Sequence, residues 1–284
     1  MSDLAAGYNL LTTGVGAVSL ARDVVRVAGP DAVSYLQGQC SQDVSALGIG
    51  SSAWSLVLQP QGKVDAWVRM TRAQEDELWL DVDGGFGEAL VARLARFKLR
   101  VKADIELLDW GCVAVRGPLA GGAGGVPFAW NGWTGYDVLG DGAAAPEGVP
   151  LVDTAAYEVR RIEAGVPRMG AELTEKTIPA EAGVVEASVS FTKGCYTGQE
   201  LVARIDSRGG NVPRRLRGVV LEGLAPAGTS VSVGGRDVGT LTSVARHPAG
   251  HAVGLAYIAR DVTPPADGVC GGVAASVRVL PLLS

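Results

Sequence analysis

The change in hydrophobic period along the chain is the feature that most constrains its fold. Up to about residue 210, alternating apolar runs typical of strands are mixed with runs whose apolar residues recur at helical spacing. After Pro213 the pattern changes to short Val-rich runs separated by turns such as Gly234-Gly235. We therefore predict an α+β fold followed by a small all-β barrel or sandwich.

The individual elements can be assigned by residue range. Strands are expected at 24–27, 54–58, 64–70, 78–83 and 136–139, and the alternation from Lys98 to Leu107 predicts one more. Helices are expected from Asp31 through Leu36, from Phe86 to Phe97, from Thr154 to Glu163 and after Thr197. The C-terminal strands are expected at 217–221, 229–233, 238–244, 252–258 and 274–280.

Composition narrows the class of protein. The 284 residues are 47% hydrophobic and 19% charged, which is typical of a globular chain with two or three subdomains. A net charge of −5 argues against a general nucleic-acid-binding surface, although a local basic patch could still bind RNA. The sequence begins without a secretory signal and has no apolar run long enough for a bilayer, so we predict a cytoplasmic protein without a membrane contact.

The metal-ligating residue types are sparse and scattered. Cys40, Cys112, Cys195 and Cys270 form no Cys-x-x-Cys pair, so neither a zinc site nor a disulfide framework is indicated. The only histidines, His247 and His251, flank Pro248 and Gly250, which favour a turn over a helix face. We predict no protein-held metal and no His-based catalytic triad.

The stretch Lys193-Gly194-Cys195-Tyr196-Thr197-Gly198-Gln199-Glu200 joins a candidate reactive thiol to a helix-start signal. Thr197 and Glu200 have the spacing of a capping box, and Tyr196 and Leu201 occupy the hydrophobic-staple positions. Cys195 would then lie just before the helix, where its dipole and nearby Lys193 favour a thiolate. The alternative is a structural helix start in which Cys195 is a small packed residue, and local physics leaves both open.

Glu163 is expected in the last turn of its helix, where a negative charge is unfavourable. One explanation is an exposed pair with Arg160 at a spacing of three. The other is a carboxylate that accepts two parallel hydrogen bonds from a planar N–H edge, such as that of a pterin.

Three further groups of residues have a functional and a structural interpretation. Asp65, Trp67 and Arg69 share a face in the expected strand register, which indicates either a ligand-facing surface or a solvent-facing surface with a cross-strand ion pair. Lys98, Arg100 and Lys102 would share a strand face suited to a polycarboxylate tail or phosphates, or simply to solvent. The stretch from Arg204 to Arg217 contains five arginines and could present a basic lip to folate carboxylates or RNA, or be a soluble hinge.

The Lys193–Glu200 stretch resembles the signature of the YgfZ family, relatives of the glycine-cleavage T-protein. Three other segments resemble the family's N-terminal, helix-end and barrel motifs in the same order. They are 27–32 with Leu36-Gln37-Gly38-Gln39-Cys40-Ser41-Gln42-Asp43-Val44, then Arg161-Ile162-Glu163-Ala164-Gly165-Val166-Pro167, and Gly239-Thr240-Leu241-Thr242-Ser243. The resemblance spans nearly the whole chain.

This resemblance implies a T-protein-like α+β fold, with two intertwined α+β subdomains and a C-terminal β-barrel around a central folate cavity. Residues 1–210 would form the folate-binding module, with an inserted subdomain at about 51–107, and residues 211–284 the barrel. It further implies that the protein binds tetrahydrofolate or a one-carbon derivative. The implied role is assembly or maintenance of iron–sulfur clusters in client enzymes, including those that modify tRNA.

The resemblance also assigns site residues. Glu163 would hold the pterin edge, and Cys195 would be the family's cysteine, beside Lys193, with a redox, sulfur-handling or transient-cluster role. One cysteine cannot hold a cluster unaided. The remaining residues expected to contact folate are Asp65, Trp67, Arg69, Tyr196 and Arg204.

Departures from the T-protein bear on the reaction. That enzyme carries adjacent aspartates after its Gly-rich hairpin, whereas Val64-Asp65-Ala66-Trp67 has one acid, and Trp133-Thr134-Gly135-Tyr136-Asp137 is the nearest remnant of its central motif. Aminomethyl transfer is therefore in doubt, and whether the chain turns over a substrate stays open. The alternatives to the accessory role are a folate-dependent aminomethyltransferase and a noncatalytic RNA- or protein-binding adaptor.

Overall fold

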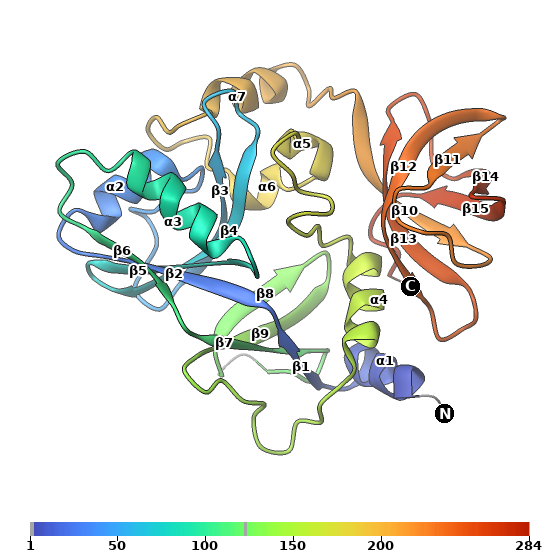
Figure 1. The fold of residues 1–284 in the computed structure, drawn as a ribbon, viewed down its shortest axis with the longest axis horizontal. Coiled ribbons are helices and arrows are strands. Elements are labelled where there is room, and N and C mark those ends of the chain that lie inside the picture. The colour runs from blue at the N-terminus through green and yellow to red at the C-terminus, as the bar shows by residue number, and fades with distance from the viewer. Residues whose placement is uncertain (1–2, 122–123, 284) are drawn as a thin grey trace.

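Three β-units make up the protein, here as a computed structural model that describes residues 3–121 and 124–283. A four-stranded sheet has the order β1-β7-β9-β8, and a five-stranded sheet has the order β3-β4-β5-β2-β6. The third unit is a closed barrel, β10-β13-β12-β11-β14-β15, which lies at the C-terminal end of the chain (Figure 1). The predicted α+β fold with a C-terminal β-barrel is confirmed.

The two sheets are intertwined because the chain leaves the smaller one after its first strand and returns after completing the larger one. The smaller sheet consists of β1 (Gly16–Leu20), β7 (Gly111–Arg116), β8 (Val126–Trp130) and β9 (Trp133–Gly140). The larger consists of β2 (Arg22–Ala28), β3 (Ser52–Leu58), β4 (Val64–Gln74), β5 (Glu77–Asp83) and β6 (Asp104–Leu108). All their strand pairs are antiparallel.

The barrel has its own apolar core of mainly aliphatic side chains, among them Val219, Leu241 and Ile258. A core of this kind is consistent with the low phenylalanine content of the sequence. Its strands are β10 (Arg214–Leu221), β11 (Ser230–Val233), β12 (Arg236–Arg246), β13 (Ala252–Ala259), β14 (Ala266–Cys270) and β15 (Val273–Arg278).

Helices cover the sheets and connect them to the barrel. They are α1 (Asp3–Thr13), α2 (Ala32–Gln39), α3 (Gly87–Arg96), α4 (Thr154–Ala164), α5 (Pro179–Ala182), α6 (Val185–Ser188) and α7 (Gln199–Ser207). Helix α4 stands between the smaller sheet and the barrel, with α1 beside it (Figure 1). None of the helices in the described residues is long and apolar enough to cross a membrane.

Helix α4 begins and ends on residues with clear capping roles. Asp153, rather than Thr154, is its N-cap, and its Oδ1 accepts a hydrogen bond from Ala155 N at 2.6 Å. Gly165 ends the helix with φ 70°, a left-handed conformation that glycine adopts readily. The helix end predicted near Gly165 is confirmed, and it fixes where Arg161 and Glu163 point.

The predicted strand from Lys98 to Leu107 is wrong in its first half, because β6 begins only at Asp104. Arg100 has φ 58°, which breaks an extended backbone. The segment is instead held by loop contacts, since Asp31 Oδ2 accepts from Lys102 N at 2.8 Å and Lys102 O accepts from Asp31 N at 3.2 Å. Lys98, Arg100 and Lys102 therefore do not form one strand face.

Candidate functional site

A cavity of about 370 Å³ lies where the two sheets meet helix α4 and the segment that follows it. This volume is within the usual range of small-molecule sites. Three aromatic side chains, Trp54, Trp67 and Phe128, form its apolar wall. The rings of Trp54 and Trp67 are stacked, with centroids 4.1 Å apart and planes 14° from parallel, and Phe128 meets Trp54 edge-on. Such a wall suits a flat ring.

A network of alternating arginines and aspartates forms the second wall, in which Arg69 and Asp81 lie behind the residues that line the cavity. Asp83 and Asp81 both pair with Arg22, at 3.0 and 2.6 Å, and Asp81 also pairs with Arg69 at 3.0 Å. Arg69 continues to Asp137 at 2.7 Å, and Asp137 pairs with Arg116 at 2.7 Å. The three arginines and three aspartates of this network balance in charge, so the wall is close to neutral.

The pKa values of this network follow from its burial. Burial alone would raise the pKa of Asp137, but the charges of Arg116 and Arg69 outweigh it and lower the pKa. Tyr157 also lines the cavity, and burial raises its pKa to about 12 because it outweighs the lowering effect of Arg116. Both groups therefore keep one protonation state at neutral pH.

A third wall comes from α4 and the loop after it. Arg161 Nη2 pairs with Glu158 Oε2 at 3.0 Å, and Arg161 Nη1 donates to Val166 O at 2.7 Å. Arg168 is 46% exposed at this wall and approaches Glu158 at 3.5 Å. Of the charged residues that line the cavity, Arg168 is thus the most open to a ligand.

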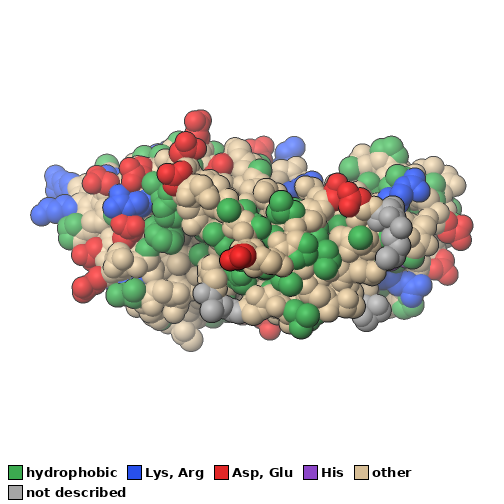
Figure 2. Space-filling view, turned by 90° about the horizontal axis from the view of Figure 1, so that it is seen from below, with side chains coloured by type: hydrophobic (Ala, Val, Ile, Leu, Met, Phe, Trp, Pro, Cys, Tyr) green, Lys and Arg blue, Asp and Glu red, His purple; other side chains and the backbone are tan. Residues whose placement is uncertain are grey.

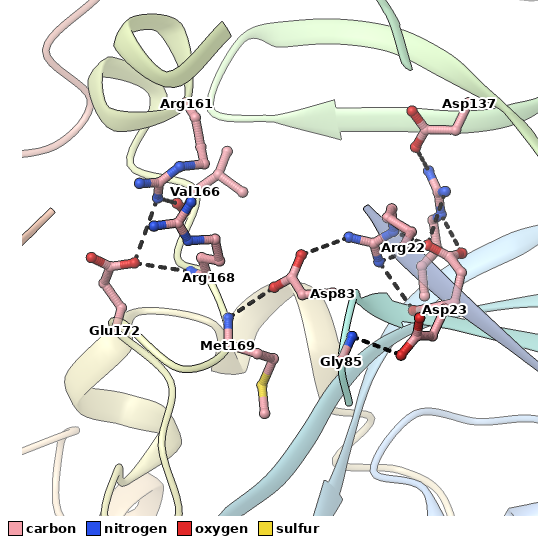
Figure 3. Close-up of polar contacts among 12 residues, drawn as sticks. Arg22, Asp23, Asp83, Gly85, Asp137, Arg161, Val166, Arg168, Met169 and Glu172 are labelled. Carbon is pink, nitrogen blue, oxygen red and sulfur yellow. Dashed lines mark hydrogen bonds and ion pairs between the residues drawn. The ribbon is translucent and has the colours of Figure 1, made fainter. Parts of the chain in front are cut away.

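The loop 166–173 joins the charged walls (Figure 3), and through Glu172 it also reaches the barrel. Met169 N donates to Asp83 Oδ2 at 2.8 Å, which connects the loop to the larger sheet. Glu172 is fully buried and accepts from Arg168 N at 3.0 Å and from Ser243 Oγ of strand β12 at 2.6 Å. The cavity wall is therefore tied to all three units.

Of the predicted strand residues, Trp67 and Arg69 share a face of β4 as expected, and Asp65 does not. Trp67 lines the cavity and donates from Nε1 to Ser188 Oγ at 2.9 Å, whereas Arg69 lies behind the cavity wall. The cross-strand ion pair weighed as an alternative is formed between Arg69 and Asp81, but in the interior. Asp65 instead pairs with Arg93 of α3 at 2.9 Å. It is the extra residue of a β-bulge, since Val64 and Ala66 pair with consecutive residues of β3, which breaks the alternation.

Glu163 lies on another side of α4 and is not among the described residues that line this cavity. Its Oε2 pairs with Arg160 at 2.8 Å, the contact at a spacing of three that the sequence offered as the structural explanation. The pair is buried rather than exposed, and Tyr8 and His247 complete the shell of Glu163. The role of Glu163 toward a pterin stays a prediction.

The cysteine signature packs against the N-terminal motif. Lys193 Nζ donates to Gln37 O, Cys40 O and Gln42 O at 2.7, 2.6 and 2.9 Å, at the end of α2. The ammonium group thus satisfies three backbone carbonyls. Burial lowers the pKa of Lys193, against the opposing influence of Cys40 and Asp43.

Cys195 itself is exposed, and the other three cysteines are buried. Cys195, Tyr196 and Arg204 are not among the described residues that line the cavity. Tyr196 is partly buried with its ring 5.2 Å from Lys193 Nζ, and Arg204 is exposed on α7. The predicted site residues are therefore dispersed. Trp67 lines the cavity, Asp65 lies at α3, Glu163 lies between α4 and the barrel, and the cysteine signature lies at the surface.

The predicted capping box is wrong. Helix α7 begins at Gln199, its N-cap is Gly198 with φ 82°, and Gly198 has no side chain to cap with. The reason is close packing on the β3–β4 turn, since a Cβ on Gly198 would lie 2.4 Å from Gln59 O. Gln199 Oε1 takes over part of the cap by accepting from Tyr196 N at 3.2 Å.

Sequence reasoning missed most of the cavity. Trp54 had a detectable signal, because it lies in the strand predicted to pair with that of Trp67. Arg161 lies within a motif that was identified for its neighbour Glu163. Arg22, Asp83 and Phe128 carried no local signal, since strands distant in sequence bring them together.

Comparison with solved structures defines the class of fold. The structure matches glycine cleavage system aminomethyltransferase T from Bartonella henselae with a TM-score of 0.84, covering 98% of this chain and 89% of that one at 21% identity. The protein therefore has the aminomethyltransferase T-protein fold.

Sequence comparison identifies the family. The chain is 30% identical to an aminomethyltransferase of Rubrobacter xylanophilus over 280 residues, covering 82% of this chain and 73% of the relative. It is 32% identical over 206 residues to an iron–sulfur cluster assembly factor IBA57 homolog of Pyricularia oryzae. This match covers 66% of this chain and 53% of the relative. It is 30% identical over 223 residues to tRNA-modifying protein YgfZ of Serratia proteamaculans, covering 66% of each. The chain belongs to the YgfZ/IBA57 family, which is related to the T-protein.

This family is the one the cysteine signature predicted. The match spans only about half the length of the Pyricularia relative. A scan against protein-family models found no match.

Proposed function

We propose that this protein binds tetrahydrofolate, or a one-carbon derivative, and acts as an accessory factor in the assembly or maintenance of iron–sulfur clusters in client enzymes, including tRNA-modifying ones. The observation that carries the folate part is the cavity with the stacked Trp54–Trp67 wall. The names of the IBA57 and YgfZ relatives support the iron–sulfur and tRNA part.

The cavity residues fit the chemistry of a folate. A pterin is a flat ring with N–H donors and suits an aromatic wall flanked by carboxylates, which Trp54, Trp67, Asp83 and Glu158 supply. The tail of a folate is anionic and suits the exposed guanidinium of Arg168 at the same cavity. When bound, the folate would supply one-carbon chemistry, and these residues would orient it and keep water from its ring face.

Cys195 is proposed as the working thiol at the surface that meets the client. It is the exposed member of the four cysteines, and a partner of any size can reach it. Lys193 holds the loop in place through three carbonyl contacts rather than through an ion pair with the thiol. The cytoplasmic location and the absence of a protein-held metal stay predictions.

Calorimetric titration with tetrahydrofolate tests the folate part. We expect binding by the wild type and at least a tenfold loss in Trp54→Leu, because aromatic stacking is worth about 1–3 kcal/mol. Trp79→Leu is the matched control, since Trp79 packs against Trp110 and is not among the described cavity residues. Absence of tetrahydrofolate binding by the wild-type protein would refute the folate-binding part of the proposal.

A gene-deletion strain tests the accessory role. We expect lower iron–sulfur enzyme activity and less tRNA methylthiolation under oxidative stress, with rescue by the wild type and none by Cys195→Ser. Full rescue by Cys195→Ser would remove the thiol from the mechanism. Unchanged activities in the deletion strain would count against the iron–sulfur role as a whole.

A folate-dependent aminomethyltransferase is the second candidate, favoured by the T-protein fold and by the Rubrobacter relative. The test is to supply aminomethylated lipoyl carrier and tetrahydrofolate to the purified protein and to measure ammonia. Catalytic release would support this activity, and none is expected because the cavity lacks the adjacent aspartates of the T-protein hairpin.

The adaptor alternative finds less support in the Arg204–Arg217 bridge. Arg214 pairs with Glu181 at 3.0 Å and stacks on Tyr257, and Arg215 donates to Gly210 O. Positive and negative side chains are mixed at both ends of the face that Figure 2 shows, around a largely uncharged middle. This view is from below, the side away from α7, and that side shows no continuous basic surface for RNA.

A further inference from the structure

Helix α4 carries two glutamates that differ in what surrounds them, Glu158 and Glu163. They are five residues apart, which turns them by about 140° from each other around the helix axis. The side chain of Glu158 lines the central cavity and is 24% exposed. The side chain of Glu163 is 7% exposed, toward α1 and the barrel.

Glu163 is enclosed by donor groups from three side chains and does not line the cavity. Its Oε1 accepts from Tyr8 Oη at 3.1 Å and lies 3.2 Å from His247 Nε2. Its Oε2 accepts from Tyr8 Oη at 3.2 Å and from Arg160 Nη1 at 2.8 Å. Tyr8 has one hydroxyl proton, which its two contacts share, so three donor groups enclose the carboxylate of Glu163 on the side away from the cavity.

Glu158 retains a free acceptor position and a fixed orientation. Arg161 Nε lies 3.1 Å from both Oε1 and Oε2. Oε2 also accepts from Arg161 Nη2 at 3.0 Å and lies 3.5 Å from Arg168 Nη1, so Oε1 is the more open oxygen. Arg161 is itself held by Val166 O and by the buried Glu172, so Glu158 is positioned before any ligand arrives. A pre-positioned carboxylate with an open oxygen at an aromatic cavity is suited to a ring N–H.

We infer that Glu158 is the carboxylate of α4 that accepts the N–H edge of the folate ring, and that Glu163 fastens α4 to α1 and the barrel. The inference rests on the proposed folate binding. It names the ligand class more closely, since a carboxylate acceptor selects a ring that presents N–H donors, as an amino-pyrimidinone does.

The test is calorimetric titration of Glu158→Gln and Glu163→Gln with 5-formyltetrahydrofolate, a stable reduced folate, alongside thermal melting. We expect Glu158→Gln to bind about tenfold to a hundredfold more weakly, because it loses a hydrogen bond to a charged acceptor. Arg161 keeps Val166 O and Glu172, so this variant should melt near the wild type. Glu163→Gln should melt lower and, where folded, bind like the wild type.

The opposite pattern would overturn the inference while leaving folate binding intact. That pattern is wild-type affinity in Glu158→Gln, or the larger loss of affinity in folded Glu163→Gln. If Glu158→Gln does not fold, Glu158→Asp keeps the charge but withdraws it by one methylene, and unchanged affinity there has the same meaning. No binding by the wild type would remove the proposed function, and this inference with it.

Discussion

Lys193 shows how a residue of a functional motif can have a structural task. Its ammonium lies at the end of α2 and binds three carbonyls of the segment that contains Cys40. The neighbouring Cys195 points to solvent and belongs to a different part of the same motif. The signature therefore combines a structural lysine with an exposed thiol.

Lys193→Met should lower the free energy of unfolding by about 2 kcal/mol, because hydrogen bonds to a charged donor are lost and partly buried carbonyls are left. Cys195→Ser is the control and should change it by less than about 0.5 kcal/mol, since an exposed side chain contributes little. Equilibrium urea unfolding measures both. Equal stabilities of the two variants would contradict the structural role of Lys193.

At the scale of elements, helix α7 is defined by what it packs on. Gly198 ends the signature loop in a left-handed conformation, and the β3–β4 turn approaches so closely that it leaves no room for a side chain. Thr197 and Glu200 have the spacing of a capping box, but the tertiary contact starts the helix one residue later than that box would. Tertiary packing, rather than the local sequence pattern, therefore determines where α7 begins.

Gly198→Ala should destabilise the protein by about 3 kcal/mol, of which about 1 comes from the positive φ and about 2 from the overlap with Gln59 O. Gly210→Ala isolates the first part, because Gly210 has φ 68° with nothing within 4 Å of an added Cβ. Urea unfolding of both variants gives the difference. Similar losses would mean that the hairpin turn yields to the added methyl group.

His247 makes the contact between the barrel and α4 sensitive to pH. Its Nδ1 accepts from Ala249 N, so its Nε2 carries the proton that faces Glu163. Burial lowers the pKa of His247 from its ordinary value of 6.5 against the opposing effect of Glu163, and the neighbours His251 and Arg160 add smaller effects in the lowering direction. The unfolded chain therefore binds this proton more readily than the folded protein.

The melting temperature should accordingly fall as the pH is lowered through about 6.5 toward the depressed folded value, because stability rises with pH wherever the unfolded state binds more protons. His247→Gln keeps an N–H donor toward Glu163 but does not titrate. Its melting temperature should depend less on pH between about 7.5 and 5.5 than that of the wild type. Parallel pH profiles for the two proteins would refute the assignment.

At the scale of the whole molecule, the loop 166–173 connects units that the sequence presents as separate. Glu172 receives Ser243 Oγ from the barrel, and Met169 N donates to Asp83 of the larger sheet. The cavity wall and the barrel therefore share one buried carboxylate. A movement of the barrel that displaces Glu172 would therefore also displace Arg161 and Arg168, which contact it.

Ser243→Ala should weaken this connection by about 2 kcal/mol, because a hydrogen bond to a buried carboxylate is removed. Thr242→Ala is the neighbouring control, since Thr242 Oγ1 donates to Leu255 O within the barrel. Limited proteolysis of the bridge at 208–213 should be faster in Ser243→Ala only. The same rate in both variants would show that other contacts hold the barrel in place.

Periodicity predicted what depends on local pattern, which includes five of the six barrel strands, the β3–β4 hairpin and helix α4, but it missed β14. It could not predict the bulge at Asp65, because one extra residue changes the face of a side chain without a composition signal. It also could not predict the Arg–Asp wall, because Arg22, Asp81 and Asp137 meet only after strands from both sheets are assembled. The site was recognisable through its aromatic residue Trp67 and through the family motifs, and its charged walls were not.

Cys195 is exposed while Cys40, Cys112 and Cys270 are enclosed by the fold. A thiol-reactive dye or spin label would therefore attach at one position in the folded wild-type protein, with no need to remove other cysteines. The same asymmetry holds inside a cell, where an electrophile or a mixed disulfide would mark this loop first. The motif that identifies the family is thus also the point at which the protein can be tagged, followed and captured together with whatever it touches.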